Sequence, residues 1–106
     1  MKMTNPIELS AEDAKLVTLA RGAMGRIGAS EGAAVRDDLG RTYSAAAIVL
    51  PSLRLSAVQL AVAQAAAAGA RALEAVVVYS AESQTSAGDE AVVADLGGAT
   101  IIRVSP

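Results

Sequence analysis

Two apolar segments constrain the fold of this chain more than any other feature. One runs from Ala45 to Leu50 and the other from Leu73 to Tyr79. The first is apolar on both of the faces that the alternating side chains of a strand create, and the second is a continuous buried-strand pattern. Strands of this kind are covered on both sides, as they are when helices pack against each face of a sheet. The sequence therefore predicts a sheet between two helical layers.

The first segment with the pattern of a helix lies near the N-terminus. Ser10 and Asp13 predict a capping box at its start, in which each side chain covers a backbone N–H group. Gly28 is expected to end it. Its apolar residues recur at helical spacing along one face: Leu16, Leu19, Ala20, Ala23, Met24 and Ile27.

Two further helices are expected in the second half of the chain. One should start at Ser52 or one of its neighbours, after Pro51, and run to Ala68. It is apolar nearly all round, and such a helix is either buried or an interface helix. The other is expected over residues 87–96, with the glycine pair 97–98 as its exit.

The remaining segments have the pattern of strands. Residues 29–36 and 41–50 are expected to form a hairpin around the turn 37–40, and a last strand is expected over residues 99–104. The resulting order is helix, hairpin, helix, strand, helix, strand. It predicts an α/β fold, a three-layer α/β/α sandwich whose mixed sheet has parallel pairing in its second half.

Length, composition and charge limit the classes of protein that fit. With 106 residues, the chain is expected to form a single domain over residues 10–106 after a short lead-in over residues 1–9. The absence of Cys and His excludes thiol redox chemistry and the commonest soft metal ligands. A net charge of -2 and only 2 Tyr, with no Phe or Trp, argue against a nucleic-acid surface. No apolar run of membrane-spanning length and no signal-peptide pattern occur, so no membrane contact and a cytoplasmic location are expected.

Five segments carry a more specific signal. They are Ala20–Met24, Gly32–Tyr43, Leu55–Ala61, Gln64–Tyr79 and Thr85–Leu96. In this order they resemble segments of the cytidine deaminase family: the end of its first helix, its first hairpin, the start of its catalytic helix, the rest of that helix with the next strand, and its Pro-Cys-Gly-Ala-Cys segment. The resemblance covers roughly residues 12–104 and implies the cytidine deaminase-like fold.

The resemblance also implies which positions would carry the family's chemistry. In that family a Cys or His at the start of the catalytic helix binds zinc, and a Glu two residues later moves protons. The resemblance places Ser56 at the ligand position and Val58 at the position of the Glu. It places Ser86 and Asp89 where two zinc-binding cysteines belong, and Thr85 where the Pro belongs. It thus implies a degenerate member with no catalytic residues, no bound metal and no other cofactor, in which zinc-dependent deamination is not expected.

The substrate side of the family's site is altered as well. The Asn-x-Glu-Asn segment that holds the ribose in the family falls at Ala47–Leu50, in a slightly shorter region. Nucleoside binding through the usual contacts is therefore not expected.

Simpler roles fit the same serines. Ser56 and Ser86 are interpreted as residues that cap helix starts, and Asp89 favours the same end of the third helix. A nucleophilic Ser56 would need a base, and only the amines of Lys2 and Lys15 are available in this sequence.

A cluster of acidic residues raises one more alternative. Asp37 and Asp38, together with Asp89 or Asp95, have the chemistry of a site for a hard cation. We interpret them instead as turn residues and part of a solvated face.

These observations favour one functional hypothesis and leave two others open. The first is a catalytically inactive cytidine deaminase-like protein that acts through oligomerisation, as a dimer or tetramer, or through binding of a protein partner. The alanine-rich helix Ser56–Ala68 suits close helix packing, and family members assemble through this region. The second hypothesis is a protein that binds a small ligand, a nucleoside or a base, in the vacated pocket. The third is a divergent hydrolase of the deaminase family.

Overall fold

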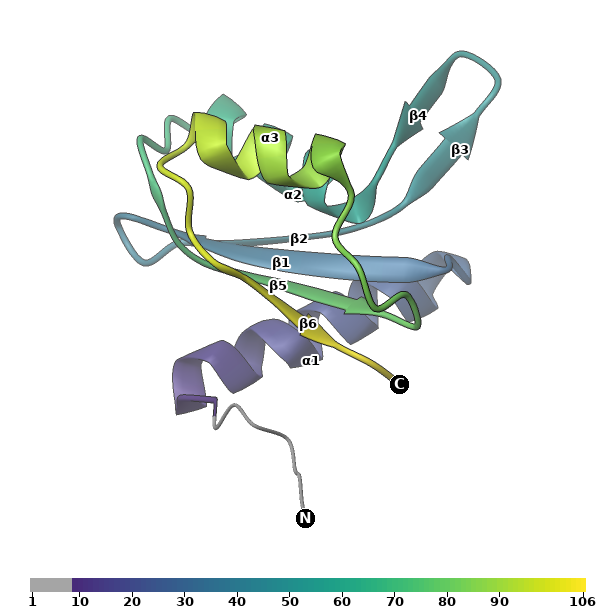
Figure 1. The fold of residues 1–106 in the computed structure, drawn as a ribbon, viewed down its shortest axis with the longest axis horizontal. Coiled ribbons are helices and arrows are strands. Elements are labelled where there is room, and N and C mark those ends of the chain that lie inside the picture. Colours follow the sequence, from purple (N-terminus) through teal and green to yellow (C-terminus); the bar gives the residue numbers. More distant parts are fainter. Residues whose placement is uncertain (1–8) are drawn as a thin grey trace.

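The computed structural model describes residues 9–106 and has three layers (Figure 1). Helix α1 (Ala11–Ile27) covers one face of a four-stranded sheet, and helices α2 (Ala57–Ala67) and α3 (Ala87–Asp95) cover the other. The sheet consists of β1 (Glu31–Asp37), β2 (Thr42–Ala46), β5 (Leu73–Ser80) and β6 (Ile101–Val104), and a separate hairpin consists of β3 (Ile48–Leu50) and β4 (Leu53–Leu55). The predicted three-layer α/β/α sandwich is confirmed. Residues 1–8 of the expected lead-in, which include Lys2, lie outside the described residues.

The sheet is mixed, as the sequence predicts. Its strand order is β2-β1-β5-β6. Strand β1 is antiparallel to both of its neighbours, so that Gly32 lies opposite Ala46 on one side and Tyr79 on the other. Strands β5 and β6 are parallel, with Val76 opposite Ile101. Parallel pairing is thus found in the second half of the chain, where it is expected.

Helix α1 begins and ends at the predicted residues. The Ser10 side chain accepts a hydrogen bond from the Asp13 backbone N–H at 3.0 Å, and Gly28 ends the helix with a φ of 63°. The Asp13 carboxylate lies in the first turn of the helix and accepts a hydrogen bond from Arg36 Nη2 at 3.0 Å. It therefore links the helix to β1. Only the serine half of the predicted capping box is therefore seen.

A close contact joins α1 to the sheet. A Cβ atom on Gly32 would lie 2.0 Å from the carbonyl oxygen of Ala20. Only a glycine lets the helix backbone approach the strand this closely. The contact brings Leu16 and Ala20 against Ala34, in the smaller of two apolar clusters. The larger cluster lies on the opposite face of the sheet, under α2 and α3.

One predicted strand is wrong over half of its length. The expected strand 41–50 ends at Ala46, and Ile48–Leu50 belongs to the separate β3–β4 hairpin. Val49 and Leu50 are 68% and 51% exposed, so this segment is not covered on both sides. The reason is a turn at Pro51 that reverses the chain and lets β3 pair with Leu53–Leu55 instead of continuing in the main sheet.

The predicted start of the second helix at Ser52 is also wrong. The N-cap residue is Ser56, and α2 begins at Ala57. Ser52 lies in the turn of the β3–β4 hairpin. None of the helices in residues 9–106 is both long and apolar enough to cross a membrane.

Candidate functional site

Ser56 forms the start of helix α2. Its Oγ accepts a hydrogen bond from the Gln59 backbone N–H at 3.0 Å, and the Gln59 side chain accepts one from the Ser56 N–H at 2.9 Å. This reciprocal pair is a capping box, which covers two N–H groups that the first turn leaves unpaired. The interpretation of Ser56 as a helix-start residue is consistent with this geometry.

Ser86 forms the start of helix α3 in the same way. Its Oγ accepts a hydrogen bond from the Asp89 backbone N–H at 3.1 Å. Asp89 is 4% exposed, and its Oδ1 accepts a 2.5 Å hydrogen bond from the Ser56 hydroxyl. The structure thus brings together Ser56, Ser86 and Asp89, the positions that the resemblance assigns to the zinc ligands.

Val58 lies in the core. It is fully buried and belongs to the apolar cluster that also contains Val35 and Val76. The position that the resemblance assigns to the proton-shuttling Glu therefore holds a hydrocarbon side chain packed among others, with no group that can donate or accept a proton.

A cavity of about 450 Å³ lies over the two helix starts. Its lining is polar and comprises Glu31, Ser56, Glu82, Gln84, Thr85, Ser86, Asp89 and Arg103. The three carboxylates outnumber the one guanidinium. The N-termini of α2 and α3 each add a partial positive charge of about half an elementary charge, which reduces the net negative charge of the cavity lining.

Four lining residues are not identified as site residues by the sequence analysis: Glu31, Glu82, Gln84 and Arg103. The Glu31 Oε1 accepts a hydrogen bond from the Ala57 N–H at 3.1 Å, so β1 contacts the start of α2. Arg103 donates to the Glu82 carbonyl oxygen at 2.9 and 3.2 Å and to Thr85 Oγ1 at 3.4 Å. A signal for Arg103 exists, because it is the one charged residue within an otherwise apolar last strand.

Other candidate residues lie away from this cavity. Asp37 ends β1 whereas Glu31 begins it, so Asp37 and Asp38 lie at the opposite end of that strand. Asp95 ends α3, at the opposite end from Ser86. Asp37 and Asp38 are thus separated from Asp89, and no group of three or more His, Cys, Asp or Glu side chains that could hold a metal ion is found within residues 9–106.

The remaining candidates are separated from the cavity too. Lys15 is exposed on α1, which covers the opposite face of the sheet from α2 (Figure 1), so it cannot act as a base for Ser56. The segment Ala47–Leu50, which the resemblance places at the family's ribose-binding position, leads into the projecting hairpin and does not line the cavity.

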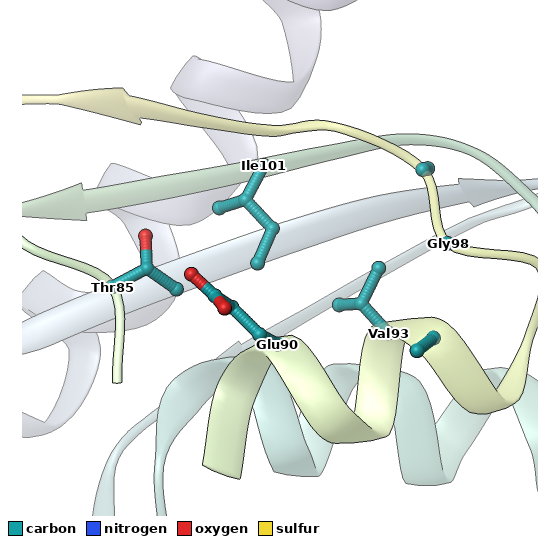
Figure 2. Close-up of a pocket in the computed structure, with 7 residues that line it drawn as sticks. Thr85, Glu90, Val93, Gly98 and Ile101 are labelled. Carbon is teal, nitrogen blue, oxygen red and sulfur yellow. The ribbon is translucent and has the colours of Figure 1, made fainter. Parts of the chain in front are cut away.

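A second cavity, of about 430 Å³, lies between α3 and β6 (Figure 2). Glu90 and Thr85 supply polar atoms on one side of it, and Val93 and Ile101 supply apolar ones. It contains none of the positions that match the zinc ligands.

The residues at the matched positions do not fit a zinc ion. Zinc is bound by thiolate, imidazole or carboxylate groups, and this set offers two neutral hydroxyls and one carboxylate. Ser56 Oγ and Ser86 Oγ each accept a hydrogen bond from a helix N–H group, and Asp89 Oδ1 accepts a hydrogen bond from the Ser56 hydroxyl. The three side chains at the matched positions therefore already take part in the hydrogen bonds that stabilise the starts of α2 and α3.

Comparisons with known proteins agree with the architecture. The sequence model of the family described as "Cytidine deaminase-like" matches residues 9–106. Among solved structures, the crystal structure of cytidine deaminase from Burkholderia pseudomallei is similar, with a TM-score of 0.72 and 21% sequence identity over 88% of this chain and 81% of that chain. A search of curated proteins found no match. On the family match and this shared fold, the chain belongs to the cytidine deaminase-like family.

Proposed function

We propose that this protein is a catalytically inactive member of its family that acts by assembling, either with copies of itself or with a protein partner. The observation that carries the proposal is the Ser56–Asp89 hydrogen bond beside the buried Val58. These residues hold the protein together at the place where the family's chemistry would need reactive groups.

The chemical requirement explains why these residues argue against deamination. In a zinc deaminase, a metal-bound hydroxide attacks the nucleobase of the substrate, since bulk water is too weak an acid at neutral pH to supply a hydroxide. A carboxylate must then carry protons between the water and the base. In this chain the set of Ser56, Ser86 and Asp89 does not fit zinc. The hydrocarbon side chain of Val58 can neither donate nor accept a proton.

The surface of helix α2 supports assembly. The helix contains no charged residue, and its outward positions Ala63, Ala66 and Ala67 are exposed. Surface helices of globular proteins normally carry charged residues on the solvent side, so an uncharged exposed face favours packing against another chain. Small side chains allow the backbones of two helices to approach closely. We expect a dimer or tetramer.

The test combines mass and chemistry on one sample. Static light scattering on the protein at micromolar concentration is expected to give a mass above that of the monomer. Elemental analysis after expression with zinc, together with cytidine and deoxycytidine turnover assays, is expected to give neither stoichiometric zinc nor product. Stoichiometric zinc together with turnover would show that the protein is an enzyme and would contradict the proposed inactivity. A monomer that co-purifies with no protein from its native cells would remove the assembly function.

The cavity over Ser56 and Asp89 favours a second candidate function, the binding of a nucleoside or a base. Its volume of about 450 Å³ is in the range of small-ligand sites, and its lining offers several hydrogen-bond acceptors. A thermal-shift screen with nucleosides and bases tests this function, and no shift with any of them counts against it. Turnover of the same compounds would instead favour the divergent hydrolase.

A cytoplasmic location is part of the proposal. Cell fractionation with an antibody against the protein tests it. Recovery in the membrane or secreted fraction would contradict it.

A further inference from the structure

Strand β6 forms one edge of the main sheet, and its outer side is open among the described residues. The strand order places it last, and its residues pair only with β5. The strand at the other edge, β2, packs against both α1 and α2, whereas β6 contacts chiefly β5. An edge strand presents backbone N–H and C=O groups that no neighbouring strand pairs. These groups are available to a further strand.

The side chains of β6 are only partly covered as well. All four residues of the strand are half-buried. Ile101 packs on the apolar cluster under α2 and α3, and Ile102 and Val104 pack on the cluster under α1. Because side chains alternate between the two faces of a sheet, a strand added beside β6 would cover apolar groups on both faces.

The cavity of about 430 Å³ between α3 and β6 lies at the same edge (Figure 2). Val93 and Ile101 point into it from the helix and the strand, and Glu90 lies on the side of Thr85. Its lining contains no residue of β5, so the cavity lies at the edge of the sheet and not beneath it. Every second side chain of a strand added to β6 would point toward α3 and enter this cavity. An open strand edge beside a side-chain cavity is the arrangement that binds extended peptides.

The charge of this region indicates the chemistry of the peptide. Glu90 is the one charged residue in the cavity lining, and it forms no ion pair with another described residue. Helix α3 carries two further carboxylates, Asp89 and Asp95, and no basic residue. The guanidinium of Arg103 on β6 is already held by hydrogen bonds to the loop that precedes α3. A basic side chain of a partner therefore meets a carboxylate that nothing else neutralises.

The same charges argue against a second copy of this chain at this edge. A two-fold contact uses the same surface on both copies. It would combine two Glu90 carboxylates, and the one basic residue of each β6 strand, Arg103, is engaged within its own chain. The charge thus favours a different, basic segment as the occupant.

The spacing of the lining residues on α3 defines a short motif. Glu90 and Val93 are three residues apart, which corresponds to about 4.5 Å along a helix axis. Residues two apart on a strand share a face and lie about 6.7 Å from each other. Two positions is the smallest separation that keeps both side chains of a peptide on the cavity side. The peptide should therefore carry a basic residue and a large apolar residue with one residue of any type between them.

We propose that β6 and α3 bind an extended, basic segment of a partner protein. The backbone of this segment pairs with the outer edge of β6, one apolar side chain enters the cavity beside Val93 and Ile101, and one Lys or Arg side chain lies at Glu90. The inference rests on the partner-binding form of the proposed function, since it names the surface that binds and the chemistry of the partner.

The first test uses random linear peptides displayed on phage as the probes. Selection on the wild-type protein is expected to enrich peptides with Lys or Arg two positions from a large apolar residue, which bind as synthetic peptides with a dissociation constant of about 100 µM or below. Binding should slow hydrogen exchange at backbone amides within residues 101–104. Two N-methylated forms of one peptide, each methylated on one of the two alternating sets of amides, are matched controls. One set faces β6 and should lose binding, and the other faces solvent and should keep it.

The second test uses variants of exposed residues, which should leave the fold intact, as circular dichroism can check. Ala94→Trp places a large side chain in the cavity and should abolish peptide binding. Ala91→Trp, on the same helix but outside the lining, is its control and should bind as the wild type does. Glu90→Lys should weaken binding about fivefold or more, because it replaces an attraction by a repulsion. Glu12→Lys makes the same change of charge on α1 and should have no effect.

The outcomes separate this inference from the proposed function. The inference is wrong if no peptide is enriched on the wild type relative to Ala94→Trp, if the two methylated forms bind alike, or if Glu90→Lys and Glu12→Lys have equal effects. The mass from light scattering is a separate observation, so the proposed function survives each of these results. A native partner that binds Ala94→Trp as well as the wild type would leave partner binding intact and place it on another surface. Self-association that Ala94→Trp abolishes would make a second copy the occupant and overturn the inference.

Discussion

Ser56 and Asp89 join the N-termini of α2 and α3 through a 2.5 Å hydrogen bond from the serine hydroxyl to the carboxylate. The two residues lie on different helices and occupy positions where the family resemblance implies zinc ligands. A hydrogen bond between side chains thus connects two helices that a metal ion would connect in an active relative. The link is a structural one, and its removal should be measurable as a loss of stability.

The variant Ser56→Ala should destabilise the protein by about 2–3 kcal/mol. It removes an N-cap, which typically costs about 1 kcal/mol, and it leaves the buried Asp89 carboxylate without its hydroxyl partner, which costs about 1–3 kcal/mol. Urea unfolding gives the free energy. The control Ser52→Ala changes an exposed serine in the hairpin turn and should lie within about 0.5 kcal/mol of the wild type. Equal effects of the two variants would show that the Ser56–Asp89 link does not stabilise the fold.

Cysteines at the three matched positions should restore a zinc site. The triple variant Ser56→Cys, Ser86→Cys, Asp89→Cys replaces poor ligands by thiolates on a scaffold that already holds these positions at one cavity. We expect about one zinc per chain by elemental analysis and no cytidine turnover, because Val58 still lacks a proton-carrying group. Cysteines at Ser52, Ser86 and Asp89 are the matched control and should bind far less zinc. Failure of the first variant to bind zinc would mean that the ligand geometry of the family is lost.

Much of the fold follows from local sequence patterns. The Ser10 cap, the apolar face of α1 and the Gly28 exit fix the first helix without reference to other segments. The apolar run Ala75–Val78 within β5 identifies a strand that lies inside the sheet, between β1 and β6. The site was predictable only through the family resemblance, because Ser56 and Asp89 have no local pattern that places them in contact.

The β3–β4 hairpin shows where local patterns fail. Ile48–Leu50 has the composition of a buried strand, and whether such a short run is covered depends on the path of the chain beyond it. Ser52 and Ser56 both fit a helix start. Gln59 distinguishes them, since it stands three residues after Ser56 and completes a capping box. Glu31 was not predicted as a site residue because an acidic residue at the start of a strand is usually solvated.

Asp37 should make the stability of the protein depend on pH in the acid range. Its carboxylate is buried, which opposes ionisation, but hydrogen bonds from the Arg41 backbone and side chain, the Leu39 N–H and the Tyr43 hydroxyl outweigh burial and lower its pKa. A lowered folded-state pKa gives stability that is present above the unfolded pKa of about 3.9 and is lost as the pH falls through the folded pKa.

The variant Asp37→Asn should therefore be less stable than the wild type at neutral pH, and the difference should shrink as the pH falls below about 4. Urea midpoints from pH 7 down to the acid transition measure it. Asp38→Asn changes the neighbouring exposed carboxylate and serves as the control, with a small effect on stability at neutral pH. A constant difference between wild type and Asp37→Asn at all pH values would mean that the Asp37 charge does not carry the effect.

Two glycine-to-alanine variants should change stability in opposite directions. In Gly32→Ala the new methyl group would meet the Ala20 carbonyl oxygen at 2.0 Å, and since backbone cannot yield as a side chain does, α1 must shift off the sheet. We expect a loss of about 3 kcal/mol or more. In Gly22→Ala the methyl group meets nothing within 4 Å, and alanine favours the helix, so a gain of about 0.5–1 kcal/mol is expected. Thermal and urea unfolding of both variants measure the two changes. A stable Gly32→Ala protein would show that the close packing of α1 on β1 is not required by the fold.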